Sequence, residues 1–328
     1  MKILVTGSEG FIGSHLTEKL LKLGYDVKAF ILYNSFNSVG WLKDINPKYK
    51  KKIEYFFGDI RDPLLVSEAI KDCETIFHLA SLIGIPYSYI APQSYIETNI
   101  NGTLNLLNSI KEKKIKFIHT STSEVYGTAQ YQPINEFHPL NAQSPYAASK
   151  ISADQLVSAF SKSFNIPSIT IRPFNTFGPR QSLRAVIPTI ITQCFTNTKK
   201  INLGSLNPKR DFTYINDTVD GFIAGFNSSI TNGETYNLGT GTEISIHEIA
   251  KILIKKINPK LKINNDNNRI RPEKSEVMRL ISDNQKAIKE LNWKPKYINK
   301  KLNDAFDETI SWYKNNLSIN TSKSDYIV

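Results

Sequence analysis

The sequence has little of what disulfide-rich, metal-binding or membrane-spanning proteins need. Its 328 residues include two cysteines, Cys73 and Cys194, too few for a disulfide framework and without zinc-ligand spacing. The five histidines are scattered and form no His-Glu-x-x-His pattern. No apolar run approaches the ~20 residues that span a bilayer, and the chain opens on a strand pattern rather than a signal peptide. We therefore expect a cytoplasmic protein with no metal and no membrane partner.

The net charge of +11 raises the question of a nucleic-acid partner. The lysines, however, fall in short clusters at 48–52, 111–116, 255–256 and 294–301, which is typical of solvated helix faces and loops. A basic surface would equally attract a small molecule that carries a diphosphate, so charge alone cannot choose the partner. We expect no nucleic-acid binding.

The first half of the chain alternates strand patterns with helix patterns. The strands are predicted at 2–6, 27–32, 53–57, 75–79, 117–120 and 168–172, and helices at 12–23, 64–71, 95–113 and 145–164. Such alternation is typical of right-handed βαβ units in a parallel sheet with helices on both faces. The sequence therefore predicts an α/β fold: a Rossmann-type doubly wound parallel sheet with a smaller α+β C-terminal substrate lobe.

The second half is less regular and richer in Asn, Lys and Pro. A strand is predicted at 234–238, a helix at 246–257, strand and loop at 259–272, and a last amphipathic helix at 302–315. We therefore expect a dinucleotide-binding domain at 1–178, to which about 212–241 returns. The substrate lobe is expected to consist of 179–211 and 242–328.

Residues 6–13, Thr-Gly-Ser-Glu-Gly-Phe-Ile-Gly, follow the first strand and open the first helix. Glycines in this position let the backbone turn tightly and approach a pyrophosphate, which the helix N-terminus attracts. An acidic residue that would hold the adenosine ribose is missing at the end of the second strand, which reads Ile-Leu-Tyr-Asn at 31–34, since Asp26 stands at the wrong end. No arginine there awaits a 2′-phosphate either, so the pattern favours NAD over NADP.

Tyr146 and Lys150 are four residues apart on a predicted helix, with Ser144 as its N-cap and Pro145 in its first turn. This spacing puts both side chains on one face. A tyrosine base near pH 7 needs its pKa lowered by about three units, roughly what one ammonium group at ~4 Å supplies. Tyr297 and Lys301 have the same spacing but stand far from any nucleotide-binding strand, so we treat them as chance.

Residues 121–127 follow the strand at 117–120, where a parallel sheet places its ligands. Thr122 can hydrogen-bond a sugar hydroxyl that is being oxidised, while Tyr146 takes its proton. Glu124 brings a carboxylate to the same edge and is a candidate base for a carbon acid. Standing alone, Glu124 would be better explained as a surface salt-bridge residue.

These motifs together resemble the extended short-chain dehydrogenase/reductases of the nucleotide-sugar epimerase/dehydratase family. The resemblance covers nearly the whole chain and rests on residues 7–13, 77–80, 99–103, 121–127, 146–150, 172–175, 178–180, 210–212 and 271–272. Thr122-Ser123-Glu124 resembles the 4,6-dehydratases, because 4-epimerases generally lack the glutamate. The segments 34–38, 85–89 and 271–276 further resemble the N-acetylglucosamine-nucleotide 4,6-dehydratases of legionaminic acid biosynthesis.

The resemblance implies a redox-neutral reaction on GDP- or UDP-N-acetylglucosamine. Bound NAD would take hydride from sugar C4 and return it to C6, with Tyr146 accepting the O4 proton and Glu124 removing the C5 proton as water leaves C6. Dehydratases of thymidine-diphosphate glucose carry an aspartic acid where this chain has Ser123. Either Ser123 relays a proton, or Glu124 serves both steps, as GDP-mannose dehydratases with the same Thr-Ser-Glu run suggest.

The resemblance also implies the residues that contact each ligand. Thr122, Ser123, Glu124, Tyr146 and Lys150 would be catalytic. The expected NAD contacts are Gly7, Gly10, Phe11, Ile12, Gly13, Asp59, Ile60, Leu79, Ala80, Asn99, Thr120, Tyr146, Lys150 and Pro173. The expected substrate contacts are Thr122, Asn175, Arg184, Val186, Ile187, Arg210 and Arg271, with a structural ion pair as the alternative for Arg210 and Arg271.

Family members usually pair helices that correspond to 95–113 and 145–164, so a homodimer is expected. Three alternatives stay open beside the dehydratase: a UDP-glucuronate decarboxylase, a nucleotide-sugar 4-epimerase, and a dinucleotide-sensing binding protein on a decayed dehydrogenase scaffold. Thr122, Glu124, Tyr146 and Lys150 are all present, which argues against the last of these.

Overall fold

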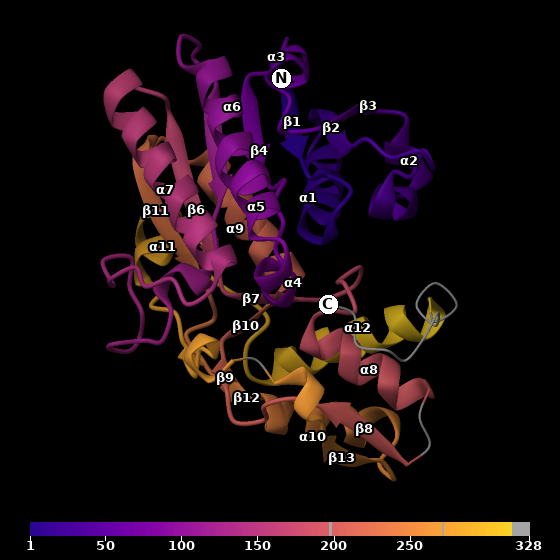
Figure 1. Cartoon of the computed structure of the whole chain (residues 1–328). Coiled ribbons are helices and arrows are strands. Elements are labelled where there is room, and N and C mark those ends of the chain that lie inside the picture. The colour runs from indigo at the N-terminus through magenta and orange to yellow at the C-terminus, as the bar shows by residue number, and fades with distance from the viewer. Residues whose placement is uncertain (197–198, 271, 317–328) are drawn as a thin grey trace.

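The computed structural model describes residues 1–196, 199–270 and 272–316, and places a large sheet domain above a smaller lobe (Figure 1). Seven parallel strands form the main sheet in the order β11-β6-β5-β4-β1-β2-β3. Their bounds are Lys2–Thr6 (β1), Asp26–Leu32 (β2), Ile53–Gly58 (β3), Thr75–His78 (β4), Lys116–Thr120 (β5), Ser168–Pro173 (β6) and Asn232–Leu238 (β11). The predicted parallel sheet is confirmed, including the strand at 234–238 that returns to it.

Both faces of the sheet are covered, as the doubly wound prediction requires. Helices α3, α6 and α7 lie next to one another on one face, and α1 and α9 on the other (Figure 1). The bounds of these helices are Phe11–Lys22 (α1), Pro63–Ala69 (α3), Gly102–Ile110 (α6), Pro145–Phe164 (α7) and Ile215–Asn227 (α9). Alternation along β1 accounts for this arrangement: Ile3 and Val5 pack in the core with α1 and α9, and Leu4 packs in the core with α3 and α6.

The predicted helix at 95–113 is less regular than its sequence pattern. It consists of α5 (Pro92–Tyr95), a π-helical segment (Ile96–Asn101) and α6, which follow one another directly. Our prediction missed the helix that precedes it, α4 (Ile85–Ile90), as well as α9 and the 3₁₀ segment Gly40–Asp44 with α2 (Pro47–Lys50) after β2. The π-helical segment contains Asn99, whose side chain contacts residues of the loop after β4.

The smaller lobe is built from short strands and three longer helices. Strand β8 (Lys200–Leu203) pairs with β13 (Lys262–Asn265), and β9 (Lys209–Arg210) lies between β12 (Ile244–Ser245) and β14 (Arg279–Leu280). The helices are α8 (Val186–Thr196), α10 (Ile246–Ile257) and α12 (Lys300–Asn315). Of these, our prediction missed α8, the four-residue strand β8 and the two-residue strands β9, β12 and β14, and strands of two residues are too short to show a periodicity.

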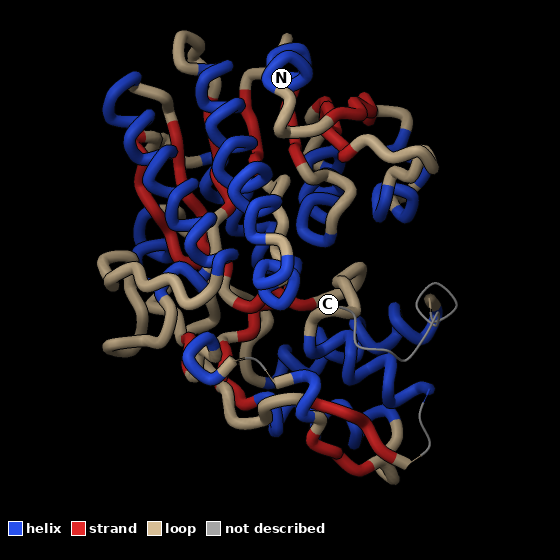
Figure 2. Tube along the Cα trace, in the orientation of Figure 1, coloured by secondary structure: helices blue, strands red, loops and turns tan. Residues whose placement is uncertain are grey.

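The two parts meet at the carboxyl ends of the sheet strands. Strands β7 (Asn175–Phe177) and β10 (Phe212–Tyr214) form a parallel pair between them, and α11 (Gln285–Glu290) lies beside β11. Figure 2 shows the N-terminus at the end of the sheet that is remote from the lobe. Because all seven strands are parallel to β1, their carboxyl ends face the lobe. Within the described residues, no helix has the length and apolar character needed to cross a membrane.

Candidate active site

A cavity of about 990 Å³ lies where the carboxyl ends of the sheet strands meet the smaller lobe. Nearly all the residues that the sequence predicts as ligand contacts line this one cavity, although they come from distant parts of the chain. They are Gly7, Gly10, Phe11, Ile12, Gly13, Asp59, Ile60, Leu79, Ala80, Thr120, Thr122, Ser123, Glu124, Tyr146, Lys150, Pro173, Asn175, Arg184, Val186, Ile187 and Arg210. The doubly wound topology explains this gathering, since such sheets bind ligands at their carboxyl edge.

Two predicted contacts stand apart from this set. Asn99 is buried and lies behind the described residues that line the cavity. Its side-chain amide donates to Ser149 Oγ at 2.9 Å and to the Leu82 carbonyl at 2.9 Å, and its oxygen accepts from Ser81 and from the Leu82 N–H. The geometry therefore gives Asn99 an indirect role, in which it supports the cavity wall and helix α7. Arg271 lies outside the described residues.

The turn between β1 and α1 fits a pyrophosphate. Gly7 has a φ of +68°, and a Cβ atom on it would lie 2.8 Å from the Ala80 nitrogen. A Cβ atom on Gly13 would lie 2.1 Å from the Gly7 oxygen, so both positions exclude a side chain. At Gly10 a Cβ atom would meet only the Gly7 oxygen, at 3.3 Å, and no side chain caps the helix here. The free N–H groups of this helix end therefore border the cavity and suit an anion.

Tyr146 lies beside Thr122 and Glu124. Helix α7 begins as predicted, with the Ala147 N–H donating to Ser144 Oγ at 3.1 Å. Burial raises the pKa of Tyr146 above its ordinary value, a hydrogen bond with Thr122 opposes this shift, and the Glu124 charge adds to it. Thr122 and Glu124 therefore both act electrostatically on the phenol, and all three side chains line the same cavity.

The Lys150 ammonium group hydrogen-bonds to the backbone, whereas we expected it to act mainly on the Tyr146 phenol. Its Nζ atom donates a hydrogen bond to the Thr120 carbonyl oxygen at 2.6 Å, and burial lowers the pKa of Lys150 to about 8. The predicted net lowering of the Tyr146 pKa does not hold in this structure, because burial outweighs the opposing interactions and raises it. Our expectation neglected the free-energy cost of removing the charged phenolate from water, which burial of Tyr146 imposes.

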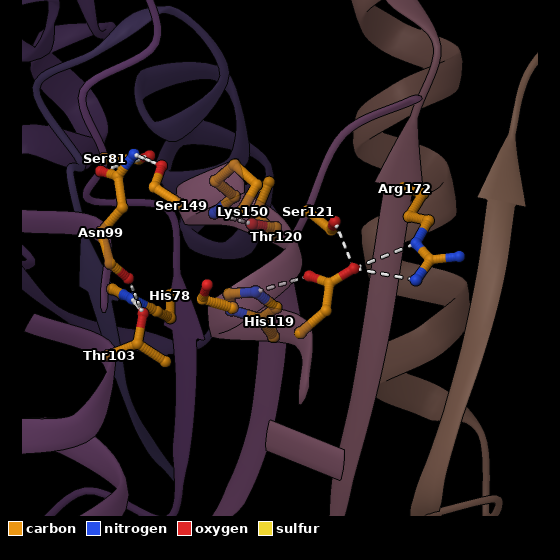
Figure 3. A network of polar contacts seen from close by, with 12 residues as sticks. His78, Ser81, Asn99, Thr103, His119, Thr120, Ser121, Ser149, Lys150 and Arg172 are labelled. Atoms are coloured by element: carbon orange, nitrogen blue, oxygen red, sulfur yellow. Dashed lines mark hydrogen bonds and ion pairs between the residues drawn. The ribbon is translucent and has the colours of Figure 1, made fainter. Parts of the chain in front are cut away.

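A buried polar network supports these residues from behind (Figure 3). The Asp154 carboxylate, which lies one turn after Lys150 on α7, accepts hydrogen bonds from Arg172 at 2.9 and 3.1 Å, from Ser121 at 2.7 Å and from His119 at 3.2 Å. Burial alone would raise the pKa of Asp154, but its interactions with His119, Arg172 and Lys150 lower it to about 2. The network therefore joins α7 to the carboxyl ends of β5 and β6.

The side of the cavity next to the lobe carries cationic and amide groups. Arg210 is buried and forms an ion pair with Glu276 at 3.2 Å. Asn175 Oδ1 is buried without a hydrogen-bond partner among the described residues, although the residue lines the cavity. Such an orphaned polar atom in a cavity wall indicates a place where a ligand donates a hydrogen bond.

The cavity also includes residues that our sequence analysis missed. These are Glu9 and Trp41 near β2, and Arg180, Arg269 and Glu276 near the lobe. Arg180 forms an ion pair with Glu18 of α1 at 2.9 Å. The motif at 178–180 contains Arg180, but our sequence analysis gave that residue no contact with a ligand. Nothing in the sequence indicated that the Glu9 side chain would reach the end of β2. Among the described residues, no cluster of His, Cys, Asp or Glu could hold a metal ion.

Comparison with known proteins identifies relatives of the whole chain. The family model described as GDP-mannose 4,6 dehydratase matches residues 4–305. A putative UDP-glucose 4-epimerase of Methanocaldococcus jannaschii is 33% identical over 320 residues, which cover 96% of this chain and 99% of the relative.

Two solved structures share the fold over nearly the same length. A UDP-glucuronic acid 4-epimerase of Bacillus cereus, in complex with UDP-glucuronic acid and NAD, has a TM-score of 0.86 at 29% identity, with 96% of this chain and 99% of that chain covered. A dTDP-glucose 4,6-dehydratase of Streptomyces venezuelae with NAD bound has a TM-score of 0.85 at 27% identity, with 97% and 98% covered. Together with the matched motifs, these similarities show that the chain belongs to the extended short-chain dehydrogenase/reductase family of nucleotide-sugar 4,6-dehydratases and 4-epimerases.

Proposed function

We propose that this protein is an NAD-dependent nucleotide-sugar 4,6-dehydratase that acts on GDP- or UDP-N-acetylglucosamine. The observation that carries the proposal is the position of Glu124, whose carboxylate lines the cavity and interacts with Tyr146. A 4-epimerase needs a proton acceptor at O4 only, whereas a 4,6-dehydratase also needs a base for the C5 proton. The Thr122-Ser123-Glu124 run supplies that base next to the phenol. The choice of N-acetylglucosamine rests on the resemblance of the segments 34–38, 85–89 and 271–276.

Each residue then has a defined task. Tyr146 accepts the proton of the sugar O4 hydroxyl, which Thr122 holds, and the Lys150 ammonium stabilises negative charge on this side of the cavity. Bound NAD supplies the oxidising power, since it can accept a hydride from C4 and return it to C6. Once C4 is a ketone, the C5 proton is acidic and Glu124 removes it as the C6 hydroxyl departs.

The proton for the departing C6 hydroxyl comes from the same wall of the cavity. Glu124 gains a proton when it deprotonates C5 and can deliver that proton to the hydroxyl, so that water leaves and the carboxylate is regenerated. Return of the hydride to C6 then leaves an enolate that must take up a proton at C5. The proton that Tyr146 accepted from O4 balances this last step. Ser123 is buried next to Glu124 and lines the cavity. A serine hydroxyl is too weak an acid for this step by itself, so Ser123 serves at most as a relay between Glu124 and C6.

The two parts of the molecule divide the ligands between them in this proposal. Residues 1–178 and 212–241 hold NAD, with the pyrophosphate at Gly10 and the adenine beside Asp59 and Ile60. Residues 179–211 and 242–328 hold the nucleotide sugar, with Arg210 next to its phosphates and Arg184, Val186 and Ile187 next to its nucleoside. We further propose that the protein is a homodimer, which sedimentation velocity tests: a monomeric species would contradict it.

Product analysis tests the proposed reaction. GDP- and UDP-N-acetylglucosamine, incubated separately with the enzyme, should yield a 4-keto-6-deoxy sugar by NMR from one of them, with no net release of NADH. The Glu124→Gln variant should form no such product but still reduce bound NAD in a single turnover, because Tyr146 is intact. A C4 epimer as the sole product would reject the proposal.

A nucleotide-sugar 4-epimerase is the second candidate, because some relatives are described as 4-epimerases, while others and the family model are described as 4,6-dehydratases. Both the Methanocaldococcus relative and the Bacillus cereus neighbour are described as 4-epimerases. Glu124→Gln separates the candidates, because epimerisation should survive loss of the C5 base. A UDP-glucuronate decarboxylase would release carbon dioxide from UDP-glucuronate, and a dinucleotide-sensing protein would turn over none of these sugars.

A further inference from the structure

Glu9 connects the glycine-rich turn to the end of β2. Its Oε1 atom accepts a hydrogen bond from the Leu32 N–H at 3.0 Å, and its backbone carbonyl accepts one from the Trp41 N–H at 3.0 Å. Glu9, Leu32, Gly40 and Trp41 all line the cavity. The side chain of Glu9 is therefore held at the position where dinucleotide-binding folds receive the adenosine ribose.

The second carboxylate oxygen of Glu9 lacks a hydrogen-bond donor among the described residues. Oε2 is buried, and none of the described residues forms a hydrogen bond with it. Burial raises the pKa of this carboxyl group, because removal from water disfavours its charged form, while backbone hydrogen bonds oppose the shift. A buried carboxylate oxygen without a hydrogen-bond donor destabilises the protein. A ligand hydroxyl that donates to this oxygen would remove that penalty, and this favours binding.

The polar side chains near Glu9 are engaged in other hydrogen bonds and ion pairs. Asn34, at the end of β2, uses its side-chain amide on the Leu32 and Ser38 carbonyls and its side-chain oxygen on backbone N–H groups of its own loop. Arg61 lines the same cavity, but its guanidinium donates to both oxygens of Asp59 and lies 3.6 Å from Glu97. Two carboxylates thus already neutralise the cation that would attract a 2′-phosphate.

We infer that Glu9 accepts a hydrogen bond from the 2′-hydroxyl of the adenosine ribose and thereby selects NAD over NADP. The acid that the sequence lacks at the end of the second strand is then supplied from the glycine-rich turn. A 2′-phosphate would bring negative charge next to a carboxylate that forms no ion pair with any of the described residues, so NADP is repelled. This inference rests on the proposed binding of NAD.

The test is a set of dissociation constants measured by isothermal titration calorimetry on the full chain, freed of co-purified nucleotide. The ligands are NAD, NADP and the NAD analogue with 2′-deoxyadenosine. We expect the wild-type protein to bind NAD about tenfold or more tightly than the deoxy analogue and at least about 100-fold more tightly than NADP. The Glu9→Gln variant should narrow the NAD to NADP ratio by at least about tenfold and bind NAD and the deoxy analogue nearly equally.

The control is Asp26→Asn, which removes an exposed carboxylate at the opposite end of β2 and should leave all three constants unchanged. Glutamine keeps the oxygen that accepts the Leu32 N–H, and a thermal unfolding scan verifies that the variant is folded. Equal affinity of the wild-type protein for NAD and the deoxy analogue would overturn the inference without any variant. An unchanged NAD to NADP ratio in Glu9→Gln would also overturn it, while absence of any dinucleotide binding would overturn the proposed function as well.

Discussion

The Lys150 Nζ atom lies 2.6 Å from the carbonyl oxygen of Thr120, so the lysine of α7 is fixed to the carboxyl end of β5. This hydrogen bond holds the ammonium group at the carboxyl edge of the sheet, next to the strand end that Thr122 follows. Burial lowers the pKa of Lys150 to about 8, and the nearby Asp154 carboxylate opposes that shift. The charge on Lys150 is therefore available near pH 7 but is maintained at a cost.

That cost gives stability a measurable pH dependence. Lys150 has a pKa of about 8 in the folded protein against an ordinary value of 10.5, so its contribution to stability is complete above pH 10.5 and is lost as the pH falls through 8. Between pH 9.5 and pH 7 the loss amounts to about 2 kcal/mol. The Lys150→Met variant should lack this loss. When the pH is lowered from 9.5 to 7, the free energy of unfolding in urea should therefore fall by about 2 kcal/mol less in the variant than in the wild type. Lys162→Met, an exposed change on the same helix, should show no such gain. A parallel pH dependence in the Lys150→Met and wild-type proteins would contradict the assignment.

Removal of the phenol should separate catalysis from binding. Tyr146→Phe leaves the buried ring in place but removes the proton acceptor, so we expect kcat to fall by about 10²–10⁴-fold. The affinity for NAD, measured by calorimetry, should change little because the ring keeps its packing. Tyr297→Phe is the matched control, since Tyr297 and Lys301 repeat the spacing but Tyr297 packs against Tyr214, away from the residues that line the cavity. Equal losses of activity in both variants would show that the tyrosine spacing carries no catalytic meaning.

The sequence predicted the sheet because its strands carry a clear signal. Buried parallel strands such as β1 and β2 contain short apolar runs, and the helices between strands have the length and periodicity of crossover connections. The smaller lobe was harder to predict for a physical reason. Strands of two or three residues such as β9 and β14 exist only because distant segments pair with them, and no local pattern records that pairing.

The candidate site shows the same division. The glycines, the tyrosine and the lysine stand at fixed spacings within single segments of the chain, so Gly7, Tyr146 and Lys150 could be predicted from the sequence. Glu9 was missed because its role depends on the direction in which the turn projects it, towards Leu32 of another strand. Asn99 was assigned to the cofactor, but its side chain is fully used by Ser81, Leu82 and Ser149, which a motif cannot reveal.

Two glycines of the first turn should respond differently to alanine. A Cβ atom at position 13 would lie 2.1 Å from the Gly7 oxygen, so Gly13→Ala should lower the free energy of unfolding by several kcal/mol, at least about 3. A Cβ atom at position 10 would contact only that same oxygen, at 3.3 Å, so Gly10→Ala should cost no more than about 1 kcal/mol. The added methyl group at position 10 lies on the cavity side and should weaken NAD binding about tenfold or more by keeping the pyrophosphate from the backbone. Urea unfolding and calorimetry measure the two effects, and unchanged NAD affinity in a folded Gly10→Ala protein would contradict the position proposed for the pyrophosphate.

The Asp154 carboxylate should govern both stability and the charge on Lys150. Its pKa of about 2 lies below the ordinary 3.8, so its stabilising contribution is present above pH 3.8 and is lost as the pH falls through 2. Asp154→Asn leaves Arg172 buried without its anionic partner and should lower the free energy of unfolding at pH 7 by about 3–5 kcal/mol. Asp304→Asn, an exposed change on α12, should stay within about 0.5 kcal/mol of the wild type.

The same variant should alter catalysis in a way that lost stability alone would not. Because the Asp154 charge raises the pKa of Lys150 against burial, its removal should lower that pKa further below 8. If the Lys150 ammonium supports proton removal by Tyr146, the alkaline limb of the kcat profile then moves to lower pH in Asp154→Asn, measured where the variant is still folded. A variant that loses activity by the same factor at every pH would show that Asp154 only holds the strands together.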